Sequence, residues 1–110
     1  MFNDLIQIET LVLRQVKLEA IIQIEFQNLL NLKHLDLSEN NLTLVNELSL
    51  GGLKSLVYLN LSFNQIAWVD EAIFIAVNNL EYLNMSNNRL RTIGCILSEY
   101  LAVNSFLNFN

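Results

Sequence analysis

The feature that most constrains this chain is a string of residues that returns every 24 positions. Its clearest copy, Leu32 to Leu42, has leucine at its first, fourth, sixth and eleventh positions and asparagine at its ninth. The same spacing begins again at Leu56 and at Leu80. Tandem self-similarity with a period of about 20 to 50 residues is typical of proteins built from stacked structural repeats. The chain is therefore predicted to fold as a repeat array.

Within each copy, the fourth and sixth positions are apolar and alternate with more polar neighbours. This period of two predicts a short strand with one buried face. Stacked copies would then form a parallel sheet with one strand per repeat. The ninth-position asparagine can both donate and accept hydrogen bonds, so it can satisfy backbone groups of its own turn and of the neighbouring turn. Asn40, Asn64 and Asn88 are predicted to form this structural ladder.

The three copies match the pattern L-x-x-L-x-L-x-x-N-x-L, and the chain resembles the leucine-rich repeat family. The resemblance implies an α/β fold, a right-handed solenoid with a parallel β-sheet on its concave face and irregular or short helical segments on its convex face. The 24-residue period resembles the typical, extracellular-receptor-like class of the family. That class favours an extracellular or cell-surface location, although the N-terminus does not read as a signal peptide and no cysteine-rich cap is present.

The repeat register predicts a single domain over residues 1–110. Its complete repeats are expected at 8–31, 32–55, 56–79 and 80–103, with partial repeats at 1–7 and 104–110. The first repeat has Val16 in place of the ninth-position asparagine. Because apolar core positions run up to both ends, the chain is predicted to be a piece of a longer array. Uncapped solenoid ends expose apolar surface and strand edges, which favours self-association.

Composition and charge exclude several classes of function. The net charge of −5 disfavours nucleic acid and anionic membrane surfaces, which require a basic face. No apolar run approaches the roughly 20 residues of a membrane span. His34 and Cys95 are the only histidine and cysteine, and they fall in different halves of their repeats. No catalytic set, metal site or cofactor is therefore predicted, and the chain is not expected to be an enzyme.

The residues that the strands direct outward are the candidates for partner binding. In the family, the second, third, fifth, seventh and eighth positions face the concave surface, where equal positions stack into columns. The third column reads Thr10, His34, Tyr58, Tyr82 and Phe106, the fifth reads Val12, Asp36, Asn60, Asn84 and Asn108, and the eighth reads Gln15, Glu39, Phe63 and Asn87. Tyrosines beside hydrogen-bonding side chains are typical of protein interfaces. The alternative is that the aromatic residues only stabilise the sheet through cross-strand contacts.

From these columns, the predicted partner-binding residues are His34, Asp36, Tyr58, Asn60, Phe63, Tyr82, Asn84 and Phe106. Three triplets also match the N-glycosylation sequon and begin at Asn41, Asn60 and Asn84. The repeat pattern itself generates Asn-Leu-Ser, which is the alternative explanation. A glycan on Asn60 or Asn84 would obstruct the proposed binding surface, so the two predictions exclude each other there.

The sequence thus predicts a protein–protein recognition module that binds through the concave sheet face, within a receptor-like or adhesion protein. Its partner is predicted to be a protein whose identity the sequence does not give. The alternative is a truncated structural or assembly fragment that self-associates through uncapped solenoid ends.

Overall fold

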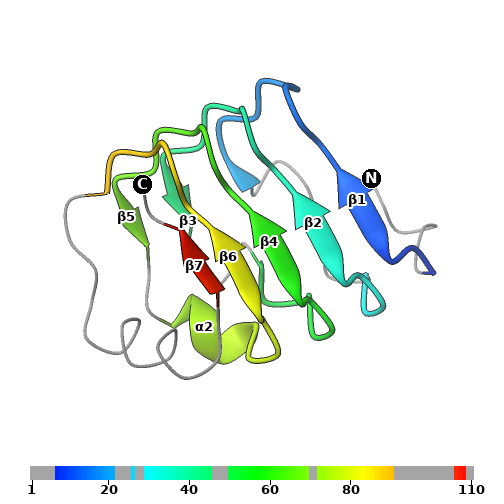
Figure 1. The fold of residues 1–110 in the computed structure, drawn as a ribbon. Coiled ribbons are helices and arrows are strands. Elements are labelled where there is room, and N and C mark those ends of the chain that lie inside the picture. The colour runs from blue at the N-terminus through cyan, green and yellow to red at the C-terminus, as the bar shows by residue number, and fades with distance from the viewer. Residues whose placement is uncertain are drawn as a thin grey trace.

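The computed structural model describes residues 7–21, 26, 29–45, 50–69, 72–90 and 106–108, with backbone alone at 74 and 106–108. Its main element is a five-stranded parallel sheet with strand order β1-β2-β4-β6-β7 (Figure 1). The strands are β1 (Thr10–Val12), β2 (His34–Asp36), β4 (Tyr58–Asn60), β6 (Tyr82–Asn84) and β7 (Phe106–Asn108). The pairing follows the repeat: Thr10 lies opposite His34, and Tyr58 lies opposite Tyr82.

The strands form where the alternation of apolar and polar residues predicts them. In β2 and β4 the central leucine is buried, whereas its two neighbours are exposed or half-buried. Each strand is only three residues long and cannot bury a core by itself. The fold is therefore stabilised mainly by contacts between neighbouring repeats, as expected when each unit contacts only its neighbours.

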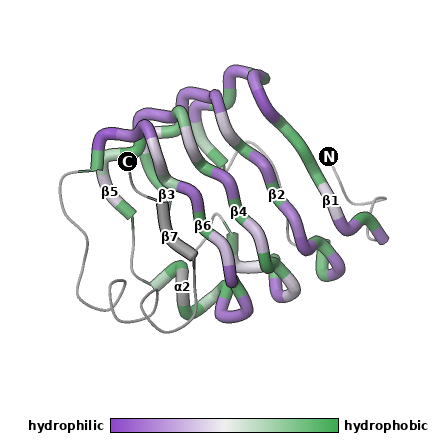
Figure 2. Tube along the Cα trace, viewed as in Figure 1, coloured by the Kyte–Doolittle hydropathy of each residue, from purple (hydrophilic) through white to green (hydrophobic). Residues whose placement is uncertain are grey.

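The core consists of columns of leucine and related side chains stacked from repeat to repeat. Leu35, Leu37 and Leu42 are fully buried, and Leu59, Leu61 and Ile66 continue the same columns. Full burial of one such side chain contributes about 1.5–3 kcal/mol. The equivalent residues of the first repeat are only partly buried against this core, and they are Ile8, Leu11, Leu13 and Leu18. Figure 2 shows that hydrophilic residues gather in the turns that follow the main strands, whereas the turns before the strands are mixed.

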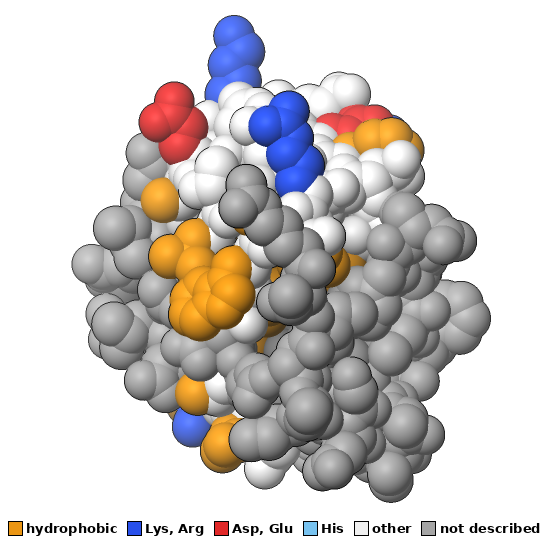
Figure 3. All heavy atoms as spheres, turned by 90° about the vertical axis from the view of Figure 1, so that its left-hand side faces the viewer, with side chains coloured by type: hydrophobic (Ala, Val, Ile, Leu, Met, Phe, Trp, Pro, Cys, Tyr) orange, Lys and Arg blue, Asp and Glu red, His pale blue; other side chains and the backbone are white. Residues whose placement is uncertain are grey.

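The opposite side of the molecule contains a second, two-stranded parallel sheet that was not predicted. It pairs β3 (Leu44–Val45) with β5 (Trp68–Val69), and α2 (Ile73–Ala76) follows as a single helical turn. Val45 and Val69 point into the core, whereas Leu44 and Trp68 are exposed. In the sequence, an apolar residue at the fourteenth position of each repeat was the signal for these strands. Figure 3 views the molecule from the β5 side and shows hydrophobic side chains on this surface.

The ninth-position asparagines connect each repeat to the one before it. The Asn64 amide donates to the carbonyl oxygen of Leu37 in the preceding repeat (3.0 Å), and its Oδ1 accepts from the Leu42 N–H (3.0 Å). The same amide donates to two carbonyl oxygens of its own turn, those of Leu61 and Ser62. Asn64 is buried, so each of these bonds forms out of contact with water.

Asn40 and Asn88 make equivalent contacts. Asn40 donates to Leu13 O (2.8 Å) and accepts from the backbone N–H groups of Val16 and Leu18. Asn88 donates to Leu61 O (2.9 Å) and accepts from the Ile66 N–H. Within the described part of the chain, no buried side-chain nitrogen or oxygen lacks a hydrogen-bond partner.

Replacing Asn64 by leucine is expected to lower the free energy of unfolding by about 1–3 kcal/mol, because the buried backbone groups it satisfies would lose their partners. Equilibrium denaturation monitored by circular dichroism measures this change. Asn41→Leu is the matched control, because Asn41 is exposed in the neighbouring repeat. Equal stability of the Asn64→Leu variant and the wild type would rule out a structural role for this amide.

Candidate protein-binding site

The outward side chains of the main sheet form two rows that run across the strands. The first row contains His34, Tyr58 and Tyr82, which the strand register sets side by side. The second row is formed by their neighbours two residues on, which are Asp36, Asn60 and Asn84. We call the surface formed by these six residues the sheet face. The backbone at Phe106 pairs with Tyr82, but the Phe106 side chain lies outside the described part of the structure.

The first row is a continuous aromatic strip. The Tyr58 and Tyr82 rings stack with centroids 4.5 Å apart and an angle of 6° between their planes. His34 meets Tyr58 edge to face, with centroids 5.4 Å apart. Burial, and then the neighbouring Tyr82, raises the pKa of the Tyr58 phenol, while a hydrogen bond from Asn60 partly offsets this rise. Tyr58 therefore presents a neutral hydroxyl group rather than a phenolate.

The second row ends each strand with the same local turn. The Oδ1 atom of Asp36 accepts a hydrogen bond from the Ser38 N–H (2.9 Å), and that of Asn60 accepts from the Ser62 N–H (3.0 Å). Asn84 makes the equivalent bond to Ser86 (3.0 Å). Asp and Asn side chains commonly stabilise turns by bonding to the backbone two residues on. The amide nitrogens of Asn60 and Asn84 take no part in these bonds.

The residue at the eighth position of each repeat has a left-handed backbone conformation. The φ angles are 59° at Gln15, 56° at Glu39, 55° at Phe63 and 57° at Asn87. This conformation lets the N–H of Phe63 donate to the Ser86 carbonyl of the next repeat (3.0 Å). Asn tolerates it better than bulky residues do. Phe63 therefore occupies a conformation that is unfavourable for a bulky residue, and the residue is 54 % exposed.

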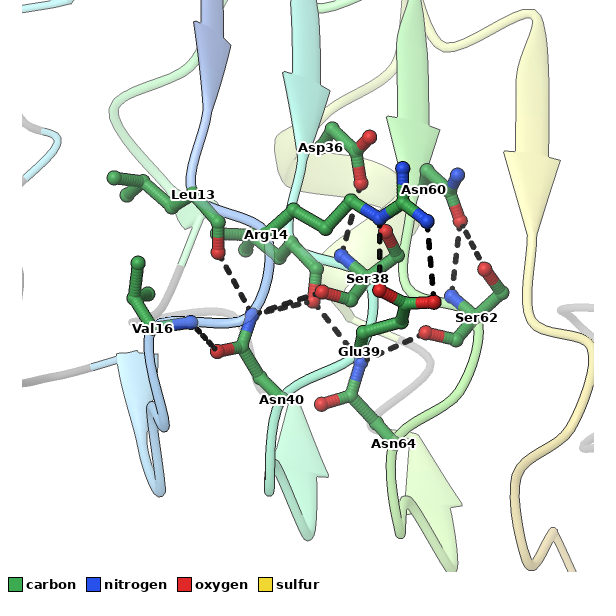
Figure 4. A network of polar contacts seen from close by, with 11 residues as sticks. Leu13, Arg14, Val16, Asp36, Ser38, Glu39, Asn40, Asn60, Ser62 and Asn64 are labelled. Atoms are coloured by element: carbon green, nitrogen blue, oxygen red, sulfur yellow. Dashed lines mark hydrogen bonds and ion pairs between the residues drawn. The ribbon is translucent and has the colours of Figure 1, made fainter.

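An ion pair that the sequence analysis did not identify lies beside the second row. Arg14 holds Glu39 through two hydrogen bonds of 2.8 and 3.1 Å (Figure 4). The hydrogen bond from Arg14 lowers the pKa of the Glu39 carboxyl, and the same contact raises the pKa of Arg14. A second pair joins Lys33 to Glu9 (3.1 Å). The signal for the first pair was the placement of Arg and Glu at adjacent positions of consecutive repeats.

The three sequons occupy different environments. Asn41 and Thr43 are both exposed. Asn60 and Asn84 are half-buried, and their Oδ1 atoms also accept hydrogen bonds of 2.7 Å from the Ser62 and Ser86 hydroxyls. Glycosylation at any of the three stays a prediction.

Other possible functional features are a reactive side chain, a metal site and a membrane span. His34 is exposed on the sheet face, and Cys95 lies outside the described part of the chain. Among the residues that the structure describes, no group of three or more His, Cys, Asp or Glu side chains could hold a metal ion. No helix in these same residues has the length and apolar character needed to span a membrane.

Strands in parallel register, leucine columns and an asparagine ladder define a repeat protein with a sheet on one side. Sequence comparison agrees: one leucine rich repeat model matches residues 6–66, and a second matches residues 79–102. The chain belongs to the leucine-rich repeat family, whose domains are generally protein–protein interaction modules and typically not enzymes. A search of curated proteins gave no match.

Replacing Phe63 by asparagine is expected to raise the free energy of unfolding by about 1 kcal/mol, since the left-handed conformation is less costly for Asn. Asn87 already occupies the equivalent position of the next repeat. Chemical denaturation of the variant beside the wild type measures the change. Gln65→Asn, at an exposed site without a left-handed backbone, is the control. A less stable Phe63→Asn variant would show that the phenylalanine ring contributes packing that outweighs the strain.

The pKa of the Glu39 carboxyl is expected to rise when Arg14 is replaced by glutamine. A carboxyl with a lowered folded-state pKa contributes stability above its unfolded pKa, and this contribution is lost as pH falls through the folded value. Carbon-detected NMR titration of the Glu39 side chain measures the midpoint directly. Lys33→Gln, which removes a cation from the other pair, should leave it unchanged. An unmoved midpoint in Arg14→Gln would contradict the pairing.

Proposed function

We propose that the chain recognises a protein partner through the sheet face, as the concave face of a right-handed solenoid in a receptor-like or adhesion protein. The observation that carries the proposal is the aromatic strip of His34, Tyr58 and Tyr82 beside the hydrogen-bonding row of Asp36, Asn60 and Asn84. Tyrosine combines a large apolar ring with a hydroxyl group, which makes it a frequent anchor of interfaces. Both rows lie on short strands and are thus held in fixed relative positions.

Sheet stabilisation alone explains only part of this surface. The stack of Tyr58 on Tyr82 would favour strand pairing in any parallel sheet. It does not account for Phe63, a large apolar residue that is exposed although its backbone conformation recurs in every repeat. Exposed apolar groups near one another often mark interaction surfaces. Phe63 therefore supports a binding role for the rim of the sheet face.

The test uses the purified chain as bait, with partners identified by mass spectrometry. Joint replacement of Tyr58 and Tyr82 by serine is expected to abolish capture of any partner that the wild type retains. Trp68→Ser is the matched control, because Trp68 is an exposed aromatic residue on the second sheet. Capture that survives the double replacement and fails in Trp68→Ser would move the site to the opposite side of the molecule.

The Phe63→Asn variant distinguishes loss of a binding contact from loss of the fold. That variant is expected to be more stable than the wild type, so reduced capture cannot arise from a weakened fold. Circular dichroism of all baits gives the fraction folded.

Self-association through the ends of the solenoid remains the second candidate function. The observation in its favour is that the first repeat keeps apolar groups accessible, with Val12 and Val16 exposed and Leu11 and Leu13 only partly buried. Accessible apolar surface next to a strand edge favours association.

A further inference from the structure

A shallow hollow of about 220 Å³ lies at the β1 end of the sheet face. Its lining residues are Thr10, Leu11, Val12, His34, Asp36 and Tyr58. The hollow lies where the small Thr10 stands in the same column as the larger His34 and Tyr58 of the next two strands. Pockets for small-molecule ligands usually measure about 300–1,000 Å³. This hollow is smaller and suits a single side chain.

Asp36 gives the hollow a charge that the fold does not require. Its structural bond to the Ser38 N–H (2.9 Å) is made equally well by asparagine in the next two repeats, at Asn60 and Asn84 (3.0 Å each). An asparagine at position 36 would thus end the strand in the same way. What aspartate adds is one negative charge at the wall of the hollow.

The nearby cations are already paired with other carboxylates. The charge of Asp36 contributes to the raised pKa of Arg14, but the Arg14 guanidinium is hydrogen-bonded by both oxygens of Glu39. Lys33 is paired with Glu9. Among the described residues, no cation forms an ion pair with Asp36. Arg14, Glu39 and Asp36 together carry +1, −1 and −1, so the group retains one net negative charge.

We propose that the hollow receives an arginine side chain of the protein partner, an inference that rests on the proposed function of the sheet face. The guanidinium would pair with the Asp36 carboxylate, while its plane lies against the exposed His34 ring. Arginine suits both contacts, because its planar cation matches carboxylate geometry and stacks on aromatic rings. Its aliphatic stem would cover Val12, which is otherwise 58 % exposed.

The test titrates isotope-labelled protein with N-acetyl-arginine methylamide and follows backbone amide signals by NMR. Saturable shifts are expected at Val12, His34 and Asp36. The citrulline derivative, which has nearly the same shape and no charge, should produce none of them. Asp36→Asn should weaken arginine binding about fivefold, the upper range for one exposed ion pair. Glu81→Gln, which removes an exposed acid outside the hollow, should leave the affinity unchanged.

Equal shifts with citrulline, or an unchanged affinity in Asp36→Asn, would overturn the inference. Folding does not confound the comparison, because asparagine makes the same strand-ending bond in two other repeats. The experiment needs no partner protein, so its failure is distinct from failure of the proposed function. If the tyrosine variants lose their partner while the arginine derivative does not bind, the sheet face remains the binding site and the arginine assignment is wrong.

Discussion

The rest of this structure depends on the hydrogen bonds that an asparagine side chain makes with the backbone of the preceding repeat. In each of three repeats, the ninth-position amide joins its own turn to the turn before it. Short strands alone could not fix the relation between repeats, because three residues offer few ladder hydrogen bonds. The asparagine supplies the missing donors and acceptors at a buried place where water cannot. It therefore supports the register of three strand pairs, β1 with β2, β2 with β4 and β4 with β6.

The same turn also determines which side chains are free to vary. Once the ninth position is fixed, the eighth takes a left-handed conformation and the fifth closes the strand through its Oδ1 atom. Leucines occupy the buried columns, and only the outward positions differ in chemistry from one repeat to the next. Threonine, histidine and two tyrosines occupy the same third-position column without changing the pairing. A scaffold of this kind can change its partner while the fold is kept.

The sequence was sufficient for the main sheet, because strand position and pairing follow from a strict 24-residue period. The features that the sequence analysis missed depend on contacts that the 24-residue spacing does not specify. The second sheet consists of two-residue strands, too short for any alternation to be recognised. The Arg14–Glu39 pair joins different positions of neighbouring repeats. The hollow beside Asp36 is lined by residues of three strands, and only the three-dimensional arrangement reveals it.

The structure also bears on the conflict between glycosylation and partner binding. Asn60-Leu61-Ser62 and Asn84-Met85-Ser86 are sequons, yet each triplet also forms a strand-ending turn with a buried serine. The second repeat has Asp36-Leu37-Ser38 at the same place, which is not a sequon, and it keeps both the turn and the buried serine. The presence of serine at this position is thus explained by its place in the turn, with or without a glycan. Asn41-Leu42-Thr43 has no such bond between its first and third residues among the described contacts, and both residues are exposed. For Asn60 and Asn84, the fold alone accounts for the triplet, and nothing about the sequence requires a glycan on the sheet face.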